Sequence, residues 1–205
     1  YEVCRAGDGL QKVLELSSDG GSSYDIAVAD DCIYVNEIYS DGSQYLLHTY
    51  DRSGNFVTAA ELDAHMELYP TKDGLYLYDS YDIALYRLGS DGASLTEVWK
   101  AAPDSDYRLL QVYEDAVYLC DSSYAYALDL DSGEASPLFR WDSFGILRCD
   151  AFYRLRDGAF FVYSMLNSTS PYRLLLPAGE SGAQRQELIF AINDPDLYGE
   201  NSIYS

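Results

Sequence analysis

The sequence repeats one short stretch four times: Asp31-Cys-Ile-Tyr-Val35, Asp73-Gly-Leu-Tyr-Leu77, Asp115-Ala-Val-Tyr-Leu119 and Asp157-Gly-Ala-Phe-Phe161. Successive aspartates are 42 residues apart, and an aromatic residue stands three places after each of them. Aspartate and glycine favour tight turns, whereas the aromatic and β-branched residues that follow favour a pleated strand. Each stretch therefore predicts a turn that leads into a strand.

A second landmark keeps nearly the same period. Four glycines that follow strand-like runs recur at intervals of 38, 41 and 46 residues: Gly54, Gly92, Gly133 and Gly179. Few windows show the apolar spacing of a helix. A group of short strands repeated about every 40 to 45 residues is typical of β-propeller blades. The sequence therefore predicts an all-β fold, a β-propeller of about four to five four-stranded antiparallel blades.

The repeats set boundaries along the chain. Residues 1–16 have the alternation of a hairpin and predict a partial blade, and full blades are expected at 24–62, 65–100, 107–141 and 146–192. Residues 193–205 match no repeat position, so we expect a C-terminal tail or the start of a further domain. The hairpin leaves two arrangements open. Either it is the remainder of an earlier blade and the ring is incomplete, or it joins strands near the C-terminus and closes the ring.

The third predicted strand carries a Tyr-x-Leu motif in three repeats, at residues 86–88, 126–128 and 172–174. Together with the turn and the x-Tyr-Leu of the second strand, this motif resembles the WD40-like and quinoprotein-like β-propellers in the broad sense. The likeness covers nearly the whole chain, although the Trp-Asp dipeptide of WD40 repeats occurs only once, at Trp141-Asp142. The resemblance implies a fold and not a function, because propellers include enzymes, scaffolds and receptors.

Residues 187–205 resemble the opening of a new domain, with a strand like those that begin bacterial solute-binding proteins. This resemblance implies the propeller part of a bacterial surface lipoprotein, and with it an extracellular or cell-surface-anchored location. The sequence shows no signal peptide and starts at Tyr1 within a strand-like run, so we expect a mature protein or a fragment whose targeting signal has been removed. It has no apolar run of 18 residues, so no transmembrane segment is expected.

The charge balance limits the possible partners. Thirteen basic and thirty-four acidic residues give a formal net charge of −21. A chain this acidic repels phosphate backbones, so we expect no nucleic acid partner and no adhesion to anionic membranes. The acidic residues keep a tyrosine-rich surface in solution, or they attract a cation or a basic partner.

The four cysteines show no metal-ligand spacing and have no histidine nearby. Cys4, Cys32, Cys120 and Cys149 fall in strand-like runs, so we expect buried free thiols that pack as small apolar side chains, and disulfides are the alternative. Neither a metal site nor a cofactor is predicted. The pairs Asp129/Asp131 and Asp194/Asp196 offer carboxylates, but neither continues into a calcium-binding loop.

Signatures of catalysis are also missing. The sequence has no Gly-x-Ser-x-Gly elbow, no phosphate-binding loop and no dinucleotide fingerprint. Paired carboxylates around a propeller channel can hydrolyse glycosidic bonds. The catalytic candidates of this kind are Asp25, Glu67 and Asp150, which stand on predicted inner strands. The alternative for these acids is a solvated channel lining without activity.

Three tyrosines are candidates for contact with a ligand. Tyr39, Tyr81 and Tyr124 follow or flank predicted strands near a sheet edge, where an aromatic face and a hydroxyl suit a glycan or a peptide. Packing within the protein is the alternative. We therefore predict a non-enzymatic extracellular propeller that binds a protein, a peptide, a glycan or a neighbouring domain at one end of its ring. The alternative is a carbohydrate-active enzyme, glycosidase-like, or a fragment of one.

Overall fold

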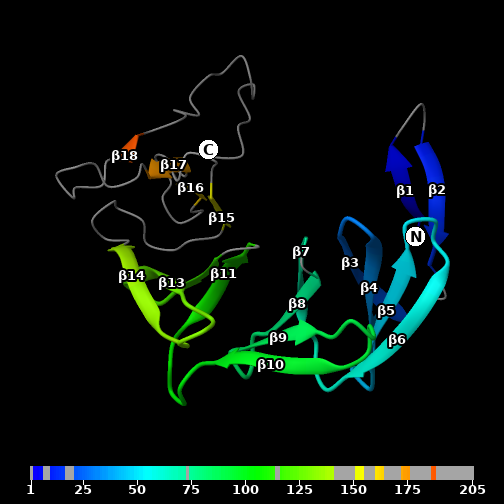
Figure 1. Ribbon diagram of the computed structural model, residues 1–205, viewed down its shortest axis with the longest axis horizontal. Helices are drawn as coiled ribbons and strands as arrows, with labels where there is room; N and C mark the ends of the chain where they lie inside the picture. The colour runs from blue at the N-terminus through cyan, green and yellow to red at the C-terminus, as the bar shows by residue number, and fades with distance from the viewer. Residues whose placement is uncertain are drawn as a thin grey trace. The chain divides into compact units, whose positions relative to one another are not determined.

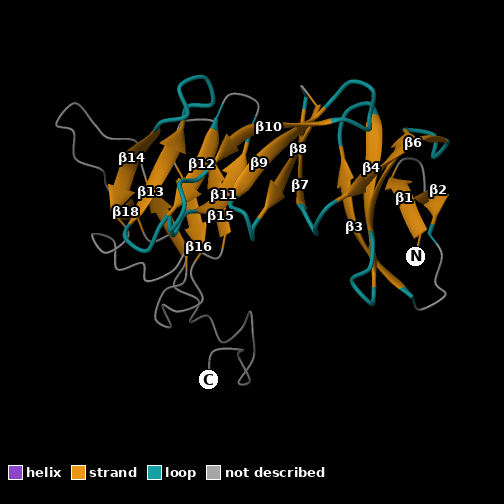
Figure 2. Cartoon of the chain, turned by 90° about the horizontal axis from the view of Figure 1, so that it is seen from below, coloured by secondary structure: helices purple, strands orange, loops and turns teal. Residues whose placement is uncertain are grey.

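The computed structural model describes residues 2–6, 10–16, 21–72, 74–113, 116–140, 151–154, 160–163, 172–175 and 186–187. Every regular element in these ranges is a β-strand (Figure 2). The chain forms two compact units, Tyr1–Ala116 and Val117–Ser205, and each is described by itself. Within the described ranges, no helix is available that could span a membrane.

The first four-stranded sheet is a meander in which consecutive strands are antiparallel neighbours (Figure 1). Its second strand is buried at four successive positions, residues 33–36, and not at alternate ones. The reason is that both faces of this sheet are covered, as predicted from the consecutive apolar residues. The strands in order are β3 (Ser22–Val28), β4 (Cys32–Tyr39), β5 (Tyr45–Asp51) and β6 (Phe56–Leu62).

Three further sheets have the same order of strands. The second contains β7 (Glu67–Thr71), β8 (Gly74–Asp79), β9 (Ala84–Leu88) and β10 (Leu95–Lys100). The third contains β11 (Arg108–Val112), β12 (Val117–Cys120), β13 (Tyr124–Leu128) and β14 (Ala135–Arg140). The fourth contains β15 (Ala151–Arg154), β16 (Phe160–Tyr163), β17 (Tyr172–Leu175) and β18 (Gln186–Glu187).

These four meanders confirm the predicted fold class. The chain is all-β, and each sheet has the four-stranded antiparallel topology of a β-propeller blade. Prolines within strands occupy positions that the topology permits, because Pro70 lies on the edge strand β7 and Pro137 on the edge strand β14. The first strands β3, β7 and β11 neighbour one another in turn within the first unit.

The last strand of a blade carries a bulge that recurs with the repeat. In the first three blades the register shifts between the third and fourth strands, which leaves Val57, Val98 and Leu138 without an opposite residue. The hairpin formed by β1 (Glu2–Ala6) and β2 (Leu10–Glu15) has the same shift, and here the extra residue is Val13. A bulge of this kind bends its strand and increases the local twist.

The core of the first unit lies between its two four-stranded sheets. Leu47 from the first sheet and Leu75 and Leu77 from the second are completely buried in one cluster, together with Tyr34 and Met66. Each fully buried leucine of this kind stabilises the fold by about 1.5–3 kcal/mol. A buried amide joins the two sheets as well, because Asn36 Nδ2 donates a hydrogen bond to the backbone oxygen of Met66 at 3.0 Å.

The hairpin β1–β2 forms a separate two-stranded sheet that contacts the other face of the first blade. Leu16 packs there against Ile33 and Val35. The turn before β6 also comes very close to the hairpin, because a Cβ atom placed on Gly54 would lie 1.7 Å from the backbone oxygen of Val13. The predicted hairpin is therefore present, although its tip at residues 7–9 lies outside the described residues.

An aromatic cluster marks the second unit. Phe160 on β16 stacks on Phe152 of β15 at 5.0 Å between ring centroids and meets Tyr118 of β12 edge-on at 5.4 Å. Phe139 of β14 approaches Phe160 at 6.0 Å. Such pairs add about 0.5–1.5 kcal/mol each to the gain from burial, so aromatic contacts hold these strands together.

Aspartates cap several turns between strands, and they form a different set from the recurring four of the sequence pattern. Asp31 lies in the bend before β4, and Asp73, Asp115 and Asp157 lie outside the described residues. The carboxylates that accept backbone N–H groups occur at hairpin turns: Asp41, Asp51, Asp79, Asp91, Asp121 and Asp129. Part of the acidity of the chain therefore has a local structural role.

These caps predict how stability depends on acid. The backbone N–H of Ser94 is the main group that lowers the pKa of Asp91, and the Asn55 side chain does the same for Asp51. A lowered folded pKa gives stability that is present above the ordinary carboxyl pKa of about 4 and lost as the pH falls through the folded value. We expect Asp91→Asn to flatten the pH dependence of the melting temperature between about pH 2 and 5, because the amide oxygen still accepts the turn hydrogen bonds. Asp63→Asn, on an exposed loop, should leave that dependence unchanged, and an equal effect of both variants would contradict the assignment.

Candidate binding pocket

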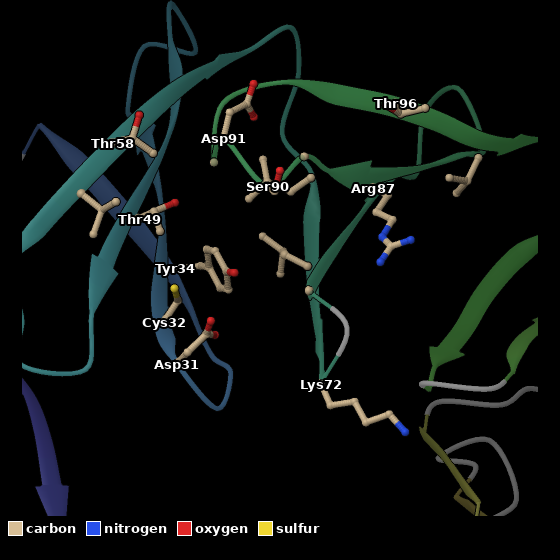
Figure 3. A pocket seen from close by; sticks show the side chains of 17 residues that line it. Asp31, Cys32, Tyr34, Thr49, Thr58, Lys72, Arg87, Ser90, Asp91 and Thr96 are labelled. Carbon is tan, nitrogen blue, oxygen red and sulfur yellow. The ribbon is translucent and has the colours of Figure 1, made fainter.

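A pocket with a volume of about 720 Å³ lies between the first and second blades (Figure 3). One wall comes from β4, β5 and β6, and the other from β8, β9, β10 and the turn between β9 and β10. Both blades belong to the first compact unit. Sites for small ligands typically have volumes of about 300–1,000 Å³, so the pocket is large enough for a short peptide segment or a small saccharide.

The first wall presents a row of hydroxyl groups. Tyr34 on β4 is directly opposite Thr49 on β5, and Thr49 is directly opposite Thr58 on β6. Residues paired in this way point to the same face of a sheet, with strands about 4.8 Å apart. The three side chains therefore form one continuous row, and all three line the pocket.

Thr49 is the most informative member of this row. Its side chain is almost completely buried, with 4% of the residue exposed, and its Oγ1 has no hydrogen-bond partner among the described residues. Figure 3 shows this hydroxyl directed into the pocket. A buried hydroxyl without a partner costs about 1–3 kcal/mol. The Cβ position of Gly92 lies 3.7 Å from this oxygen, so a ligand would reach the hydroxyl and remove that cost only if the Gly92 turn moved aside.

The second wall owes its position to glycine. Gly92 has a φ of +68°, and a Cβ atom there would lie 2.6 Å from Cγ2 of Thr58. Only glycine permits both this conformation and this approach. The neighbouring Asp91 accepts hydrogen bonds from the backbone N–H groups of Ala93 at 3.0 Å and Ser94 at 2.9 Å. These bonds favour the ionised carboxylate, so the turn brings a fixed negative charge to the pocket.

A thiol and a phenol also line the first wall, and burial favours the neutral form of both. Burial raises the pKa of Tyr34 to about 12. Burial, followed by the nearby charge of Asp31, raises the pKa of the Cys32 thiol. A reactive cysteine needs the opposite change, because the thiolate is the nucleophile. Cys32 therefore has the environment of a packed thiol and not of a catalytic one.

Two cations belong to the pocket lining but point elsewhere. Figure 3 shows the side chains of Lys72 and Arg87 extending away from the wall that carries Tyr34 and Thr49. The guanidinium of Arg87 lies 5.9 Å from the ring centroid of Tyr76, within the range of a cation–π contact. The space beside Thr49 is therefore bordered by hydroxyl groups, and two carboxylates, Asp31 and Asp91, are among the lining residues.

The acids suggested as catalytic candidates lie outside this pocket lining. Asp25 on β3 pairs with His65, with Oδ2 and Nε2 2.8 Å apart and both side chains about half exposed. Glu67 on the neighbouring strand β7 accepts a hydrogen bond from the Tyr69 hydroxyl at 2.7 Å. Asp150 lies outside the described residues. Two of the three acids thus stand on adjacent strands, and their catalytic role stays a prediction.

The three candidate tyrosines are not part of the pocket lining either. Tyr39 is half-buried at the end of β4, and Tyr81 is 93% exposed on the turn after β8. Tyr124 belongs to the second unit, where the Arg140 guanidinium lies 5.5 Å from its ring centroid. The exposure of Tyr81 leaves it accessible to a partner. A role of these three residues in binding stays a prediction.

Metal ligands and cysteines add no further chemistry to the described part of the chain. The described residues contain no group of three or more His, Cys, Asp and Glu side chains that could hold a metal ion. Of the cysteines whose side chains are described, Cys32 is a half-buried free thiol and Cys120 a buried one. Cys4 and Cys149 lie where the structure describes no side chain.

The row of hydroxyl groups was missed by reasoning from the sequence. The alignment of Thr49 with Thr58 follows the register of the sheet, and neither threonine belongs to a recurring motif. The recurring Gly54 and Gly92 were the available signal, because each stands at a turn that comes close to a neighbouring sheet. That signal indicates a close approach and not a pocket.

Comparisons with known proteins give a likeness of fold. No family model matches the sequence, and no curated protein matches it. Among solved structures, the chain is similar to the WD40 domain of SCAP from fission yeast, with a TM-score of 0.45 and 9% sequence identity. The similarity covers 89% of this chain and 57% of that one, so this chain spans little more than half of its length.

Proposed function

We propose that this chain is a non-enzymatic binding module whose ligand enters the pocket between the first and second blades. The observation that carries the proposal is the buried Thr49 hydroxyl, which points into a pocket of ligand size without a partner among the described residues. Buried polar groups in folded proteins are otherwise almost always hydrogen-bonded. An unpaired one in a cavity wall therefore fits a contact that forms on binding.

The chemistry of the pocket favours an uncharged or basic ligand. The hydroxyls of Thr49, Thr58 and Ser90 can donate or accept hydrogen bonds, and the carboxylates of Asp31 and Asp91 only accept them when ionised. The net charge of −21 attracts a basic partner and repels an acidic one. The ligand that we expect first is therefore a neutral or basic peptide, and the second candidate ligand is a neutral glycan. The proposal includes an extracellular location, supported by the likeness of residues 187–205 to the opening of bacterial solute-binding proteins.

Replacing Thr49 by valine tests this function. We expect Thr49→Val to bind a ligand, selected on peptide and glycan arrays with the unmodified protein, about fivefold more weakly, because a net hydrogen bond of about 1 kcal/mol is lost. The melting temperature should stay the same or rise, because the variant removes an unpaired buried hydroxyl without changing the volume much. Isothermal titration calorimetry and thermal unfolding measure the two effects.

The control separates pocket binding from the enzyme alternative. That alternative has one specific observation in its favour, the position of Asp25 and Glu67 on adjacent strands. Asp25→Asn combined with Glu67→Gln should leave binding at the pocket unchanged. Unaltered affinity in Thr49→Val would refute the pocket as the binding site. Hydrolysis of an array glycan that disappears in the double variant would establish the enzyme instead.

A further inference from the structure

The N-terminal hairpin has the structure of the outer half of a blade. Its extra residue Val13 belongs to a series with Val57, Val98 and Leu138, each of which bulges from the last strand of its blade, at intervals of 44, 41 and 40 residues. By contrast, the first and second strands of the first two blades pair in a continuous register without a bulge. Strand β1 thus corresponds to a third strand and β2 to a fourth.

Contacts between neighbouring sheets support the same correspondence. The turn at Gly92 in the second blade approaches Thr58, next to the bulge residue of the first blade. The equivalent turn at Gly54 in the first blade approaches Val13, the bulge residue of the hairpin. The hairpin therefore contacts the first blade in the way that the outer strands of the first blade contact the second.

The contact between the hairpin and the first blade differs from the contact between the first and second blades at the inner strands. Ile26 is paired with Val35, so it lies on the face of the first blade that the hairpin covers. Its equivalent 42 residues later is Leu68, which packs into the core against the first blade. Ile26 is instead 43% exposed, and Val28 on the same face is 50% exposed. The first blade therefore has a strip of exposed apolar side chains. At the equivalent place on the second blade, the inner strands of the first blade cover the apolar side chains.

Among the described strands, β1 leaves one sheet edge without a partner strand, and this edge lies beside the strip. In each complete blade the third strand pairs with the second on one side and with the fourth on the other. Strand β1 pairs with β2, and no other described strand joins this sheet. An edge next to exposed apolar side chains is the arrangement that accepts an added strand.

We propose that a two-stranded antiparallel segment with one apolar face, joined to the start of β1 by a short turn, completes this sheet as its inner pair. Its apolar face covers Ile26 and Val28, and its second strand hydrogen-bonds to the free edge of β1. The connection follows from the blade topology, because second and third strands are joined by short turns in the first three blades, as at residues 80–83. This inference does not depend on the proposed function.

The test adds such a pair to the chain. Residues 65–83 contain the inner pair of the second blade and its turn, so a copy of this segment is placed directly before Glu2 of the full chain. We expect the outward-facing amides of β1 to exchange with deuterium at least about tenfold more slowly than in the unextended chain, because they become hydrogen-bonded. An Ile26→Cys variant should react with a thiol reagent at least about fivefold more slowly when the copy covers it.

Two controls keep the result decisive. A copy that carries Tyr76→Asp and Tyr78→Asp loses the face that would meet the first blade, because these positions are equivalent to Tyr34 and Asn36, and it should protect neither β1 nor position 26. Ile26→Lys should be tolerated in the unextended chain, because the side chain is already exposed, but should abolish protection of β1 in the extended chain. The proposal is overturned if β1 exchanges equally fast with and without the unmodified copy. It is also overturned if the same segment protects β1 only when added as a separate peptide.

Discussion

Replacing Leu77 by alanine is expected to lower the free energy of unfolding of the first unit by about 3 kcal/mol. Leu77 is completely buried between the first two blades, in the cluster that includes Leu47 and Leu75. The variant loses the transfer free energy of the removed carbon atoms and leaves a cavity that two packed sheets cannot fill by collapsing. Urea unfolding followed by tryptophan fluorescence measures the change, since Trp99 is buried in the same unit.

A conservative variant separates volume from position. Leu77→Met keeps most of the side-chain volume and should cost less than about 1.5 kcal/mol. Val57→Ala removes apolar atoms from a residue that is 58% exposed and should cost clearly less than Leu77→Ala. A loss for Leu77→Ala as small as that for Val57→Ala would show that the two blades do not share a packed core.

Replacing Gly54 by alanine is expected to destabilise the first unit by about 2 kcal/mol or more, because two costs combine. Gly54 has a φ of +83°, a conformation that costs an L-residue about 1–2 kcal/mol. The new Cβ would also meet the backbone oxygen of Val13, which cannot rotate away as a flexible side chain can. The hairpin must shift to make room, so hydrogen exchange of β2 should accelerate along with the fall in melting temperature.

Gly42 supplies the matched control. Its φ of +67° is similarly positive, but the nearest atom to an added Cβ is the Tyr45 hydroxyl oxygen at 3.8 Å, an ordinary contact distance. Gly42→Ala should therefore show the conformational cost alone and leave the exchange of β2 unchanged. Equal effects of the two variants on β2 would mean that the hairpin does not rest on the Gly54 turn.

The strands and their grouping were predictable because each signal was local. A turn residue followed by an apolar run identifies β4, β8, β12 and β16, and the repeat period assigns each to a four-stranded sheet. The burial of both faces of β4 also followed from its consecutive apolar residues. The capping role of Asp51 or Asp91 was not apparent, because it depends on local hydrogen bonds and not on a recurring position in the sequence.

The pocket was not predictable because it depends on pairing between strands. Thr49 and Thr58 are ordinary strand residues in the sequence, and they align only through the register of β5 and β6. The bulge at Val57 fixes that register on one side, and no residue type marks a bulge of this kind. The proximity of Gly92 to Thr58 arises from the packing of two sheets, which a period in the sequence does not describe.

The candidate acids show the same division between local and distant information. Asp25 and Glu67 were correctly placed on first strands, because the repeat assigns those positions. Their surroundings were not predictable, because the His65 ring that pairs with Asp25 lies 40 residues away in sequence. The Tyr69 hydroxyl that donates to Glu67 is only two residues away, yet the strand pattern gives no sign of that hydrogen bond.

The capped turns have a consequence for the evolution of such chains. An asparagine oxygen accepts the same backbone hydrogen bonds as an aspartate oxygen, so the capping positions can exchange one residue for the other without altering the path of the backbone. Exchange at all six positions would change the net charge from −21 to −15 while the blades persist. Homologues with a smaller acidic excess would then share this architecture, and the degree of acidity would be a poor criterion for finding them.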